Sequence, residues 1–275
     1  MSKKNKDRPL PESLGLPCIG VETHAHLDYQ RLDPENLPLV LERAARAGIA
    51  RIGNVFLGLE AYRANAVAFA AYPQVFFLLG IHPNDAAQSD LRHVADMAAL
   101  FAADANLKAI GETGLDFYWD ETPREVQEKF FREQLALARE LGKPVAVHSR
   151  DAAAETLAIL DESGLPGEQV LWHCFGGGPD LAAQLSGRGY VVSIPGPVTY
   201  PKNDALREAV ALLDMSRLVL ESDAPFLTPE PYRGRPNEPA YNVFTAQAVA
   251  RVKGLDTRDV WERTAANARR FFGLE

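Results

Sequence analysis

The stretch KPVAVHSRDAAAETLAILDESGLPGEQVLWHCF (residues 143–175) contains a complete strand–helix–strand unit. Its two ends, 143–149 and 169–175, are short apolar runs of the kind that form strands buried on both faces of a parallel sheet. Between them, RDAAAETLAILDESG shows the 3.6-residue apolar spacing of a helix and stops at Gly164. Each strand-like run has a histidine near its end, His148 in the first and His173 in the second.

The same alternation occurs along the whole chain. The other strand-like runs are CIGVETH (18–24), IARIGNVF (49–56), VFFLLGI (75–81), LKAIGE (107–112), YVVSI (190–194) and RLVLES (217–222). Eight β–α units in roughly 250 residues predict an α/β protein with a single-domain (β/α)8 TIM-type barrel. A doubly wound open sheet is the alternative, but no GxGxxG motif follows the first run. We expect the barrel over residues 18–275 and a flexible N-terminal tail over residues 1–17.

Composition limits the function classes. The formal net charge of −8 argues against tight, non-specific binding of duplex nucleic acid over a broad surface. It leaves room for a local site where metal ions and a few arginines meet phosphate. No apolar run approaches the ~18 residues of a membrane-spanning helix, and the two cysteines, Cys18 and Cys174, form no disulfide framework. We expect a cytoplasmic protein with no membrane association and no obligate protein partner.

Histidines and carboxylates gather where the predicted strands end. In VETHAHLD (21–28), His24 and His26 are two residues apart, so they project from the same face of a strand. The side chains at or just after the ends of other runs are those of His82, Glu112, His148, His173 and Asp223. Because the carboxyl ends of all eight strands meet at one mouth of such a barrel, these groups predict a metal site there.

The number of ligands predicts two metal ions. One ion would be held by His24, His26, Glu112 and Asp223, and the second by Glu112, His148 and His173. A carboxylate such as Glu112 can bridge ions about 3.5–4 Å apart. Mixed imidazole and carboxylate ligands suit Zn2+, Mn2+, Fe2+ or Co2+. The predicted chemistry is metal-assisted hydrolysis, with Glu112 bridging the ions and Asp223 accepting a proton from the attacking water.

Several motifs occur in the order found in one known family. The motifs lie within residues 21–239 and are THAHLD, GIHP, GETGLDFYW, KPVAVHSRDA, HCFGG and ESDAPFL with a later YRG. Together they resemble the TatD family of metal-dependent hydrolases. The resemblance implies a (β/α)8 barrel that binds Mg2+ or Mn2+ and acts as a deoxyribonuclease, trimming single-stranded DNA from the 3′ end. The ligands it implies are the six named above. Glu22 and Ser222 stand where Asp and Thr are usual, and both changes leave the ligands intact.

Two other functions stay open at this point. One is a metallo-esterase on the same barrel, such as the D-aminoacyl-tRNA deacylases among TatD-like proteins, which cleave an ester of tRNA. A non-catalytic metal-binding barrel is disfavoured because the ligands and Asp223 are all present. A carbamylated-lysine hydrolase is disfavoured because no predicted strand ends in lysine.

A phosphodiester substrate needs positive groups near the metals and surfaces on which bases can stack. His82, Arg150 and Arg233 are the candidates for phosphate contact. Arg150 could instead pair with a nearby acid, such as Asp151 or Glu155. Tyr118 and Trp119 follow Glu112 and are candidates for base stacking.

Overall fold

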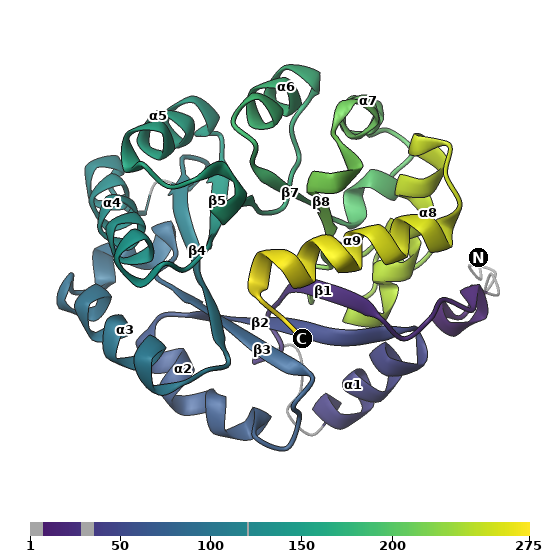
Figure 1. Ribbon diagram of the computed structural model, residues 1–275, viewed down its shortest axis with the longest axis horizontal. Helices are drawn as coiled ribbons and strands as arrows, with labels where there is room; N and C mark the ends of the chain where they lie inside the picture. Colours follow the sequence, from purple (N-terminus) through teal and green to yellow (C-terminus); the bar gives the residue numbers. More distant parts are fainter. Residues whose placement is uncertain (1–7, 29–35, 120) are drawn as a thin grey trace, which may run out of the picture.

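Eight parallel strands form one sheet with helices packed around it (Figure 1). This computed structural model describes residues 8–28, 36–119 and 121–275. The sheet order follows the chain from β1 to β8, and a parallel bridge between Ala25 and Ala224 links β1 to the segment after β8. The predicted (β/α)8 barrel is therefore confirmed. Its strands are β1 (Gly20–Ala25), β2 (Ile49–Leu57), β3 (Val75–Gly80), β4 (Leu107–Asp116), β5 (Val145–Arg150), β6 (Val170–Trp172), β7 (Val191–Ile194) and β8 (Leu218–Leu220).

Helices follow the strands in the alternating order that the apolar spacing predicts. They are α1 (Leu37–Arg46), α2 (Leu59–Asn65), α3 (Arg92–Ala103), α4 (Arg124–Leu141), α5 (Ala153–Ser163), α6 (Pro179–Gly187), α7 (Asp204–Leu212), α8 (Asn242–Lys253) and α9 (Thr257–Phe272). The predicted stop of α5 at Gly164 is confirmed, and α4 ends in the same way at Gly142; both glycines adopt left-handed conformations, with φ of 71° and 61°. Glycine takes this conformation without the steric cost that a Cβ would add.

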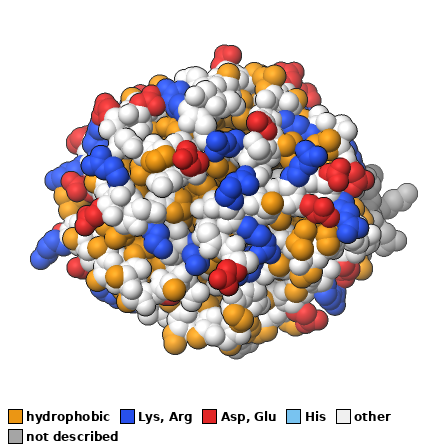
Figure 2. All heavy atoms as spheres, viewed as in Figure 1, with side chains coloured by type: hydrophobic (Ala, Val, Ile, Leu, Met, Phe, Trp, Pro, Cys, Tyr) orange, Lys and Arg blue, Asp and Glu red, His pale blue; other side chains and the backbone are white. Residues whose placement is uncertain are grey.

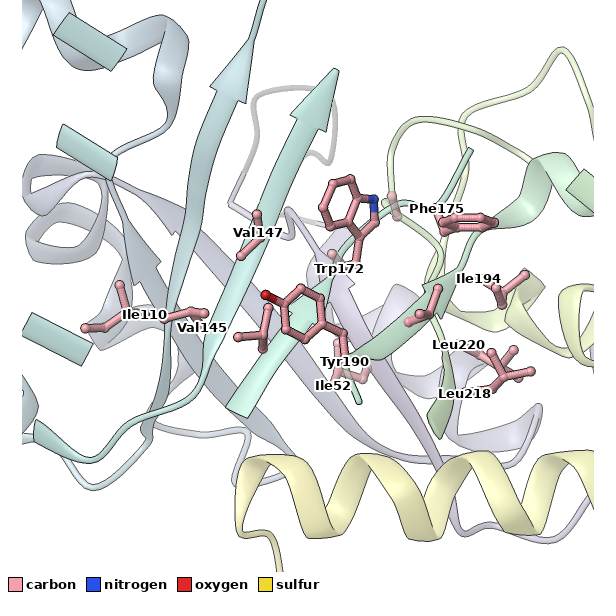
Figure 3. Close-up of a cluster of buried hydrophobic side chains, with 14 of the residues drawn as sticks. Ile52, Ile110, Val145, Val147, Trp172, Phe175, Tyr190, Ile194, Leu218 and Leu220 are labelled. Carbon is pink, nitrogen blue, oxygen red and sulfur yellow. The ribbon is translucent and has the colours of Figure 1, made fainter. Parts of the chain in front are cut away.

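Alternate residues of a strand pack into two separate apolar layers. In β5, Val145 and Val147 join the cluster between the sheet and the helices, whereas Ala146 joins the cluster inside the barrel. Figure 3 shows the outer layer, where Val145 and Val147 lie in the same cluster as Trp172. Trp172 is 2% exposed, as expected for a core residue. The next inward position of β5 after Ala146 belongs to His148, so the strand period that builds the core also directs this imidazole inward.

One end of the barrel is closed by α9, which crosses it in Figure 1. A Cβ on Gly20, the first residue of β1, would lie 2.0 Å from Trp261 Cζ2. Asn267 Nδ2 donates to the carbonyl of Leu218, the first residue of β8. These contacts place α9 at the amino ends of the strands, and Figure 2 shows basic, acidic and apolar side chains interspersed on that face. The carboxyl ends, where the site is predicted, lie at the opposite face.

Several predicted boundaries are wrong: β6 ends at Trp172 instead of residue 175, β8 ends at Leu220 instead of residue 222, and β4 and β5 differ as well. β4 does not end at Glu112 but continues to Asp116, whose partner on β5 is Arg150. Arg150 itself is the last residue of β5, and α5 begins only at Ala153 rather than at Arg150. Polar residues and glycines in this stretch resemble a loop in sequence. The ladder between β4 and β5 nevertheless extends the strands past the metal-site residues.

The N-terminal segment is described from Arg8, and residues 1–7 lie outside the described part of the chain. Arg8 Nε donates to the carbonyl of Pro231 at 2.7 Å, and Trp261 Nε1 donates to that of Pro17 at 3.0 Å. Residues 8–17 thus lie against the barrel. Among the described residues, no helix is both long and apolar enough to cross a membrane.

Candidate metal centre

Glu112 lies at the centre of a group of histidines at the carboxyl ends of the strands. It is 4% exposed, and each of the surrounding imidazoles has a ring nitrogen within 3.8 Å of one of its carboxylate oxygens. The shortest separations are 3.3 Å for His24, 3.8 Å for His26, 3.7 Å for His82, 2.6 Å for His148 and 3.4 Å for His173. His24 and His26 approach one carboxylate oxygen and the other three approach the second. One carboxylate therefore faces two sets of imidazoles.

Two of these histidines have a second carboxylate behind the ring. His173 Nδ1 lies 2.9 Å from Glu221 Oε2, and its Nε2 faces Glu112. His148 uses the opposite nitrogens, with Nε2 3.0 Å from Asp116 Oδ2 and Nδ1 facing Glu112. When a metal ion occupies the centre, the outer carboxylate would keep the proton on the nitrogen next to it and leave the lone pair of the other nitrogen for the ion, which is how metal-ligating histidines are usually oriented.

His24 has the most unusual surroundings in the group. It is fully buried, and neither ring nitrogen has a hydrogen-bond partner among the described residues. Its ring stacks on that of His173 with centroids 3.5 Å apart. Burial lowers the pKa of His24, so the ring is neutral and keeps a lone pair. A buried polar atom without a partner costs free energy, and a coordinated cation would remove that cost. The site thus fits a divalent metal ion.

Charge at the centre also favours a cation. Burial opposes ionisation of Glu112, but His173 and His148 outweigh it and hold the pKa of this carboxyl well below its ordinary value. Burial likewise opposes the charged form of His148, yet hydrogen bonds to Asp116 and Glu112 raise its pKa to about 9. Carboxylates in this pocket therefore stabilise positive charge, which metal ions would supply in place of protons.

Asp223 joins the group from the segment after β8. Its Oδ1 lies 3.4 Å from His26 Nε2, and its side chain is 14% exposed, so it lies at the solvent side of the centre. The residue adopts a left-handed conformation with φ of 55°, and its N–H donates to the carbonyl of His24 at 2.9 Å. Such a conformation is strained for a residue with a Cβ, and strain of this kind is concentrated at functional sites.

Glu22 connects the two segments that carry Asp223 and His24. This fully buried carboxylate accepts hydrogen bonds from the backbone N–H groups of His24 at 3.0 Å and Ser222 at 2.8 Å, and from Asn242 Nδ2 at 3.0 Å. Burial raises the pKa of Glu22 to about 8 despite these donors. The hydrogen bonds hold β1 and the segment after β8 in register, which positions His24 beside Asp223.

All six predicted ligands lie together in this centre. Groups whose ligand atoms lie within 4.8 Å of one another are His24–His26–Glu112, Glu112–His148–His173 and His24–His173–Asp223. The second contains the three ligands predicted for one ion, and the first contains three of the four predicted for the other, without Asp223. The third places Asp223 close to His173 as well as to His24. His82, Asp116 and His148 form a further group of this kind.

His82 is positioned to donate a hydrogen bond from its Nε2. Its Nδ1 accepts from the backbone N–H of Asn84 at 3.2 Å, which leaves the proton on Nε2. That Nε2 lies 3.7 Å from Glu112 Oε1. Burial, together with the neighbouring His148, lowers the pKa of His82 to about 3, so the ring is neutral. A neutral imidazole with a directed N–H can bind an anionic oxygen.

Both predicted phosphate-binding arginines are exposed and stacked on aromatic rings. The guanidinium carbon of Arg150 lies 3.7 Å from the ring centroid of Tyr118, and that of Arg233 lies 4.0 Å from the centroid of Tyr200. Within the described residues, Arg150 forms no ion pair with Asp151 or with any other acid. The ion-pair alternative for Arg150 is therefore not what the structure shows.

Sequence reasoning missed the roles of Asp116 and Glu221. Both are buried, at 1% and 0% exposure, and each lies behind a histidine of the centre. A signal was present in the sequence. Asp116 closes the GETGLD motif and Glu221 directly precedes Ser222 and Asp223, so both are carboxylates placed beside strand ends. Their burial and partners could not be inferred without the fold.

Comparisons with known proteins agree with this geometry. A family model described as TatD related DNase matches residues 21–273. The chain is 34% identical over 256 residues to the Bacillus subtilis protein named uncharacterized metal-dependent hydrolase YabD, covering 92% of this chain and 98% of that one. It is 39% identical over 242 residues to the Cronobacter sakazakii protein named 3′-5′ ssDNA/RNA exonuclease TatD, covering 84% and 90%.

Among solved structures, the TatD homologue YjjV from Escherichia coli K12 superposes with a TM-score of 0.87. Its sequence is 26% identical, and the match covers 94% of this chain and 99% of that one. The similarity therefore extends over the whole barrel and is not restricted to the motifs at its mouth.

Proposed function

Since this chain belongs to the TatD family of metal-dependent hydrolases, we propose that it hydrolyses the phosphodiester bonds of single-stranded DNA, starting from the 3′ end. The convergence of imidazoles on Glu112, with Asp223 at the solvent side, is the observation that carries the proposal. The name of the Cronobacter sakazakii relative supports single-stranded nucleic acid as the substrate class.

We propose two divalent ions at this centre, with Glu112 shared between them. One would be held by His24, His26, Glu112 and Asp223, and the other by Glu112, His148 and His173. The two oxygens of Glu112 already face these two sets separately. Ions held there would act as Lewis acids on a phosphoryl oxygen of the scissile bond and lower the pKa of the attacking water. Mg2+ or Mn2+ is proposed from the family, and the imidazole-rich ligand set also suits Zn2+.

The remaining steps are assigned to side chains of the chain. Asp223 is the proposed acceptor of the proton that leaves the attacking water, because its carboxylate is the one that reaches the solvent side of the centre. His82 is proposed to donate its Nε2 proton in a hydrogen bond to a phosphate oxygen. Arg150 and Arg233 are proposed to bind flanking phosphates through their guanidinium N–H groups. The cytoplasm is the proposed location, and the free Cys18 and Cys174 agree with a reducing compartment.

A labelled oligonucleotide tests this function directly. Metal-stripped protein would be incubated with 5′-labelled single-stranded DNA, with and without added Mg2+, Mn2+ or Zn2+. Asp223→Asn protein, purified identically, controls for a contaminating nuclease. We expect a ladder that shortens from the 3′ end only when metal is present and Asp223 is intact. Counting bound ions by elemental analysis of the same samples tests the two-ion assignment.

The alternative ester chemistry is the informative negative outcome. If the oligonucleotide stays intact in every metal while D-aminoacyl-tRNA is deacylated by the wild type and not by Asp223→Asn, the exonuclease proposal is wrong. The hydrolytic centre would then act on a carboxylic ester at the 3′ end of tRNA.

A further inference from the structure

Two neighbouring aromatic side chains are exposed beside the metal centre, and neither belongs to it. Tyr118 is 53% exposed and Trp119 is 48% exposed, which is unusual for side chains of this size. Their rings meet edge to face, with centroids 4.9 Å apart at an angle of 88°. Arg150 lies on the Tyr118 ring at 3.7 Å and within 5.8 Å of the Trp119 ring. We name Tyr118, Trp119 and Arg150 the stacking platform.

The stacking platform is fixed to the same carboxylate that supports the metal centre. Asp116 Oδ1 accepts from the backbone N–H of Tyr118 at 3.0 Å and lies 3.4 Å from that of Trp119. Its other oxygen, Oδ2, lies 3.0 Å from His148 Nε2. One buried side chain thus positions both a predicted ligand and the two aromatic residues. The backbone that carries the two rings is therefore held in place in the free protein, which lowers the cost of ordering it around a ligand.

Arg150 is placed by the strand that carries His148. The two residues are two positions apart on β5, so their side chains project from the same face. The backbone is held by the β4–β5 ladder, in which the N–H of Phe117 donates to the carbonyl of Arg150 at 2.9 Å. Because the guanidinium is stacked rather than paired with an acid in the described part of the chain, its N–H groups are available to an anion. Guanidinium N–H groups match the geometry of phosphate oxygens.

We propose that the stacking platform binds one unpaired nucleobase together with its adjoining phosphate, next to the bond cleaved at the metal centre. The inference rests on the proposed function and assigns its substrate contacts. An aromatic face accepts any base, so recognition here would be independent of sequence. A base inside a duplex has both faces covered by its neighbours and cannot stack on a side chain. The platform would therefore select single strands over duplexes.

Tryptophan fluorescence can observe this binding without catalysis. Of the three tryptophans, Trp172 and Trp261 are 2% and 1% exposed, and only Trp119 can contact a ligand in solution. Metal-stripped protein would be titrated in chelator with a short oligothymidylate, which cannot be cleaved under these conditions. We expect quenching of the emission that saturates with binding, and no comparable quenching by a duplex. Trp119→Phe should bind the oligonucleotide with little change in emission, because its two remaining tryptophans are buried.

Affinities of variants separate stacking from charge. Binding followed by anisotropy of a labelled oligonucleotide should weaken roughly 5- to 150-fold in Trp119→Ala, the range expected for loss of one stacked base. Leu212→Ala removes a side chain that is 66% exposed at the end of α7, and it is the matched control, expected to bind like wild type. Arg150→Ala should reduce the slope of log affinity against log salt by about 0.7, as for one lost phosphate contact on a single strand.

The outcomes distinguish this inference from the proposed function. Three results would each overturn the stacking platform. The first is tryptophan emission that stays constant while anisotropy shows saturated binding, and the second is equal quenching by a duplex. The third is wild-type affinity in Trp119→Ala. If one of these results is found and the wild-type protein still trims DNA when metal is added, the exonuclease proposal stands without the platform. If the metal-free protein is quenched as expected but the loaded enzyme leaves DNA intact, the platform stands and the reaction needs another assignment.

Discussion

Glu221 should control metal affinity through His173, although it is not proposed as a ligand. Its Oε2 lies 2.9 Å from His173 Nδ1 across 48 residues of chain, and its Oε1 has no hydrogen-bond partner in the described residues. Glu221→Gln keeps an acceptor for His173 but removes the charge. Glu221→Ala removes both. The fully buried position excludes water, so little solvent can replace either property.

The expected losses follow from the strength of that hydrogen bond. A hydrogen bond to a charged group contributes about 1.5–3 kcal/mol, roughly twice the value between neutral groups. Glu221→Ala should therefore lower the affinity for the ion held by His173 by roughly 10- to 100-fold, a range also found when other partners of metal-ligating histidines are mutated. Glu221→Gln should lose about half of the free energy of binding that Glu221→Ala loses, which corresponds to a metal affinity lower by roughly 3- to 10-fold.

Calorimetric titration of metal-stripped protein with Zn2+ or Mn2+ measures this series. Glu168→Gln, an exposed glutamate just before β6, is the matched control and should bind metal like wild type. Thermal unfolding of each metal-free variant checks that the barrel is intact. Equal metal affinity in wild type, Glu221→Gln and Glu221→Ala would refute the conclusion that this carboxylate positions His173.

Three further changes test other parts of the structure. Glu112→Ala should abolish turnover and leave fewer than two bound ions by elemental analysis; an active variant with two ions would rule out the shared carboxylate. Asp223→Asn should retain at least one ion but lose about 10²–10⁴-fold in rate, as expected for a general base, and near-normal turnover would exclude that role. Gly20→Ala places a Cβ 2.0 Å from Trp261 and should cost about 1–3 kcal/mol of unfolding free energy in urea titrations; unchanged stability would show that α9 adjusts freely.

The barrel was predictable because its strands are buried on both faces. Short apolar runs such as 75–81 differ from the spaced apolar pattern of the helices, so all eight strands could be located. The strand ends that are hardest to predict from the sequence belong to the strands that carry residues of the candidate site. β4 continues through polar residues to Asp116, where pairing with β5 stabilises a strand that composition alone does not predict.

The candidate ligands were predictable for a related reason. Parallel strands bring their carboxyl ends to one face, so His24, Glu112 and Asp223 had to approach one another once each was assigned to a strand end. That argument locates residues but does not orient side chains. It could not show that His82 has its Nδ1 occupied by the Asn84 N–H, nor that Arg150 stacks on Tyr118 instead of pairing with an acid.

The sequence by itself determined the eightfold strand–helix alternation and the set of histidines and carboxylates at the strand ends, because both follow from local apolar spacing and residue type. Only the tertiary structure decided which nitrogen of each imidazole faces the centre. That choice depends on partners distant in the chain: Asp116 lies 32 residues from His148 and contacts its Nε2, whereas Glu221 lies 48 residues from His173 and contacts its Nδ1. Hydrogen bonds of this kind form only after the strands have assembled, so no local pattern encodes them.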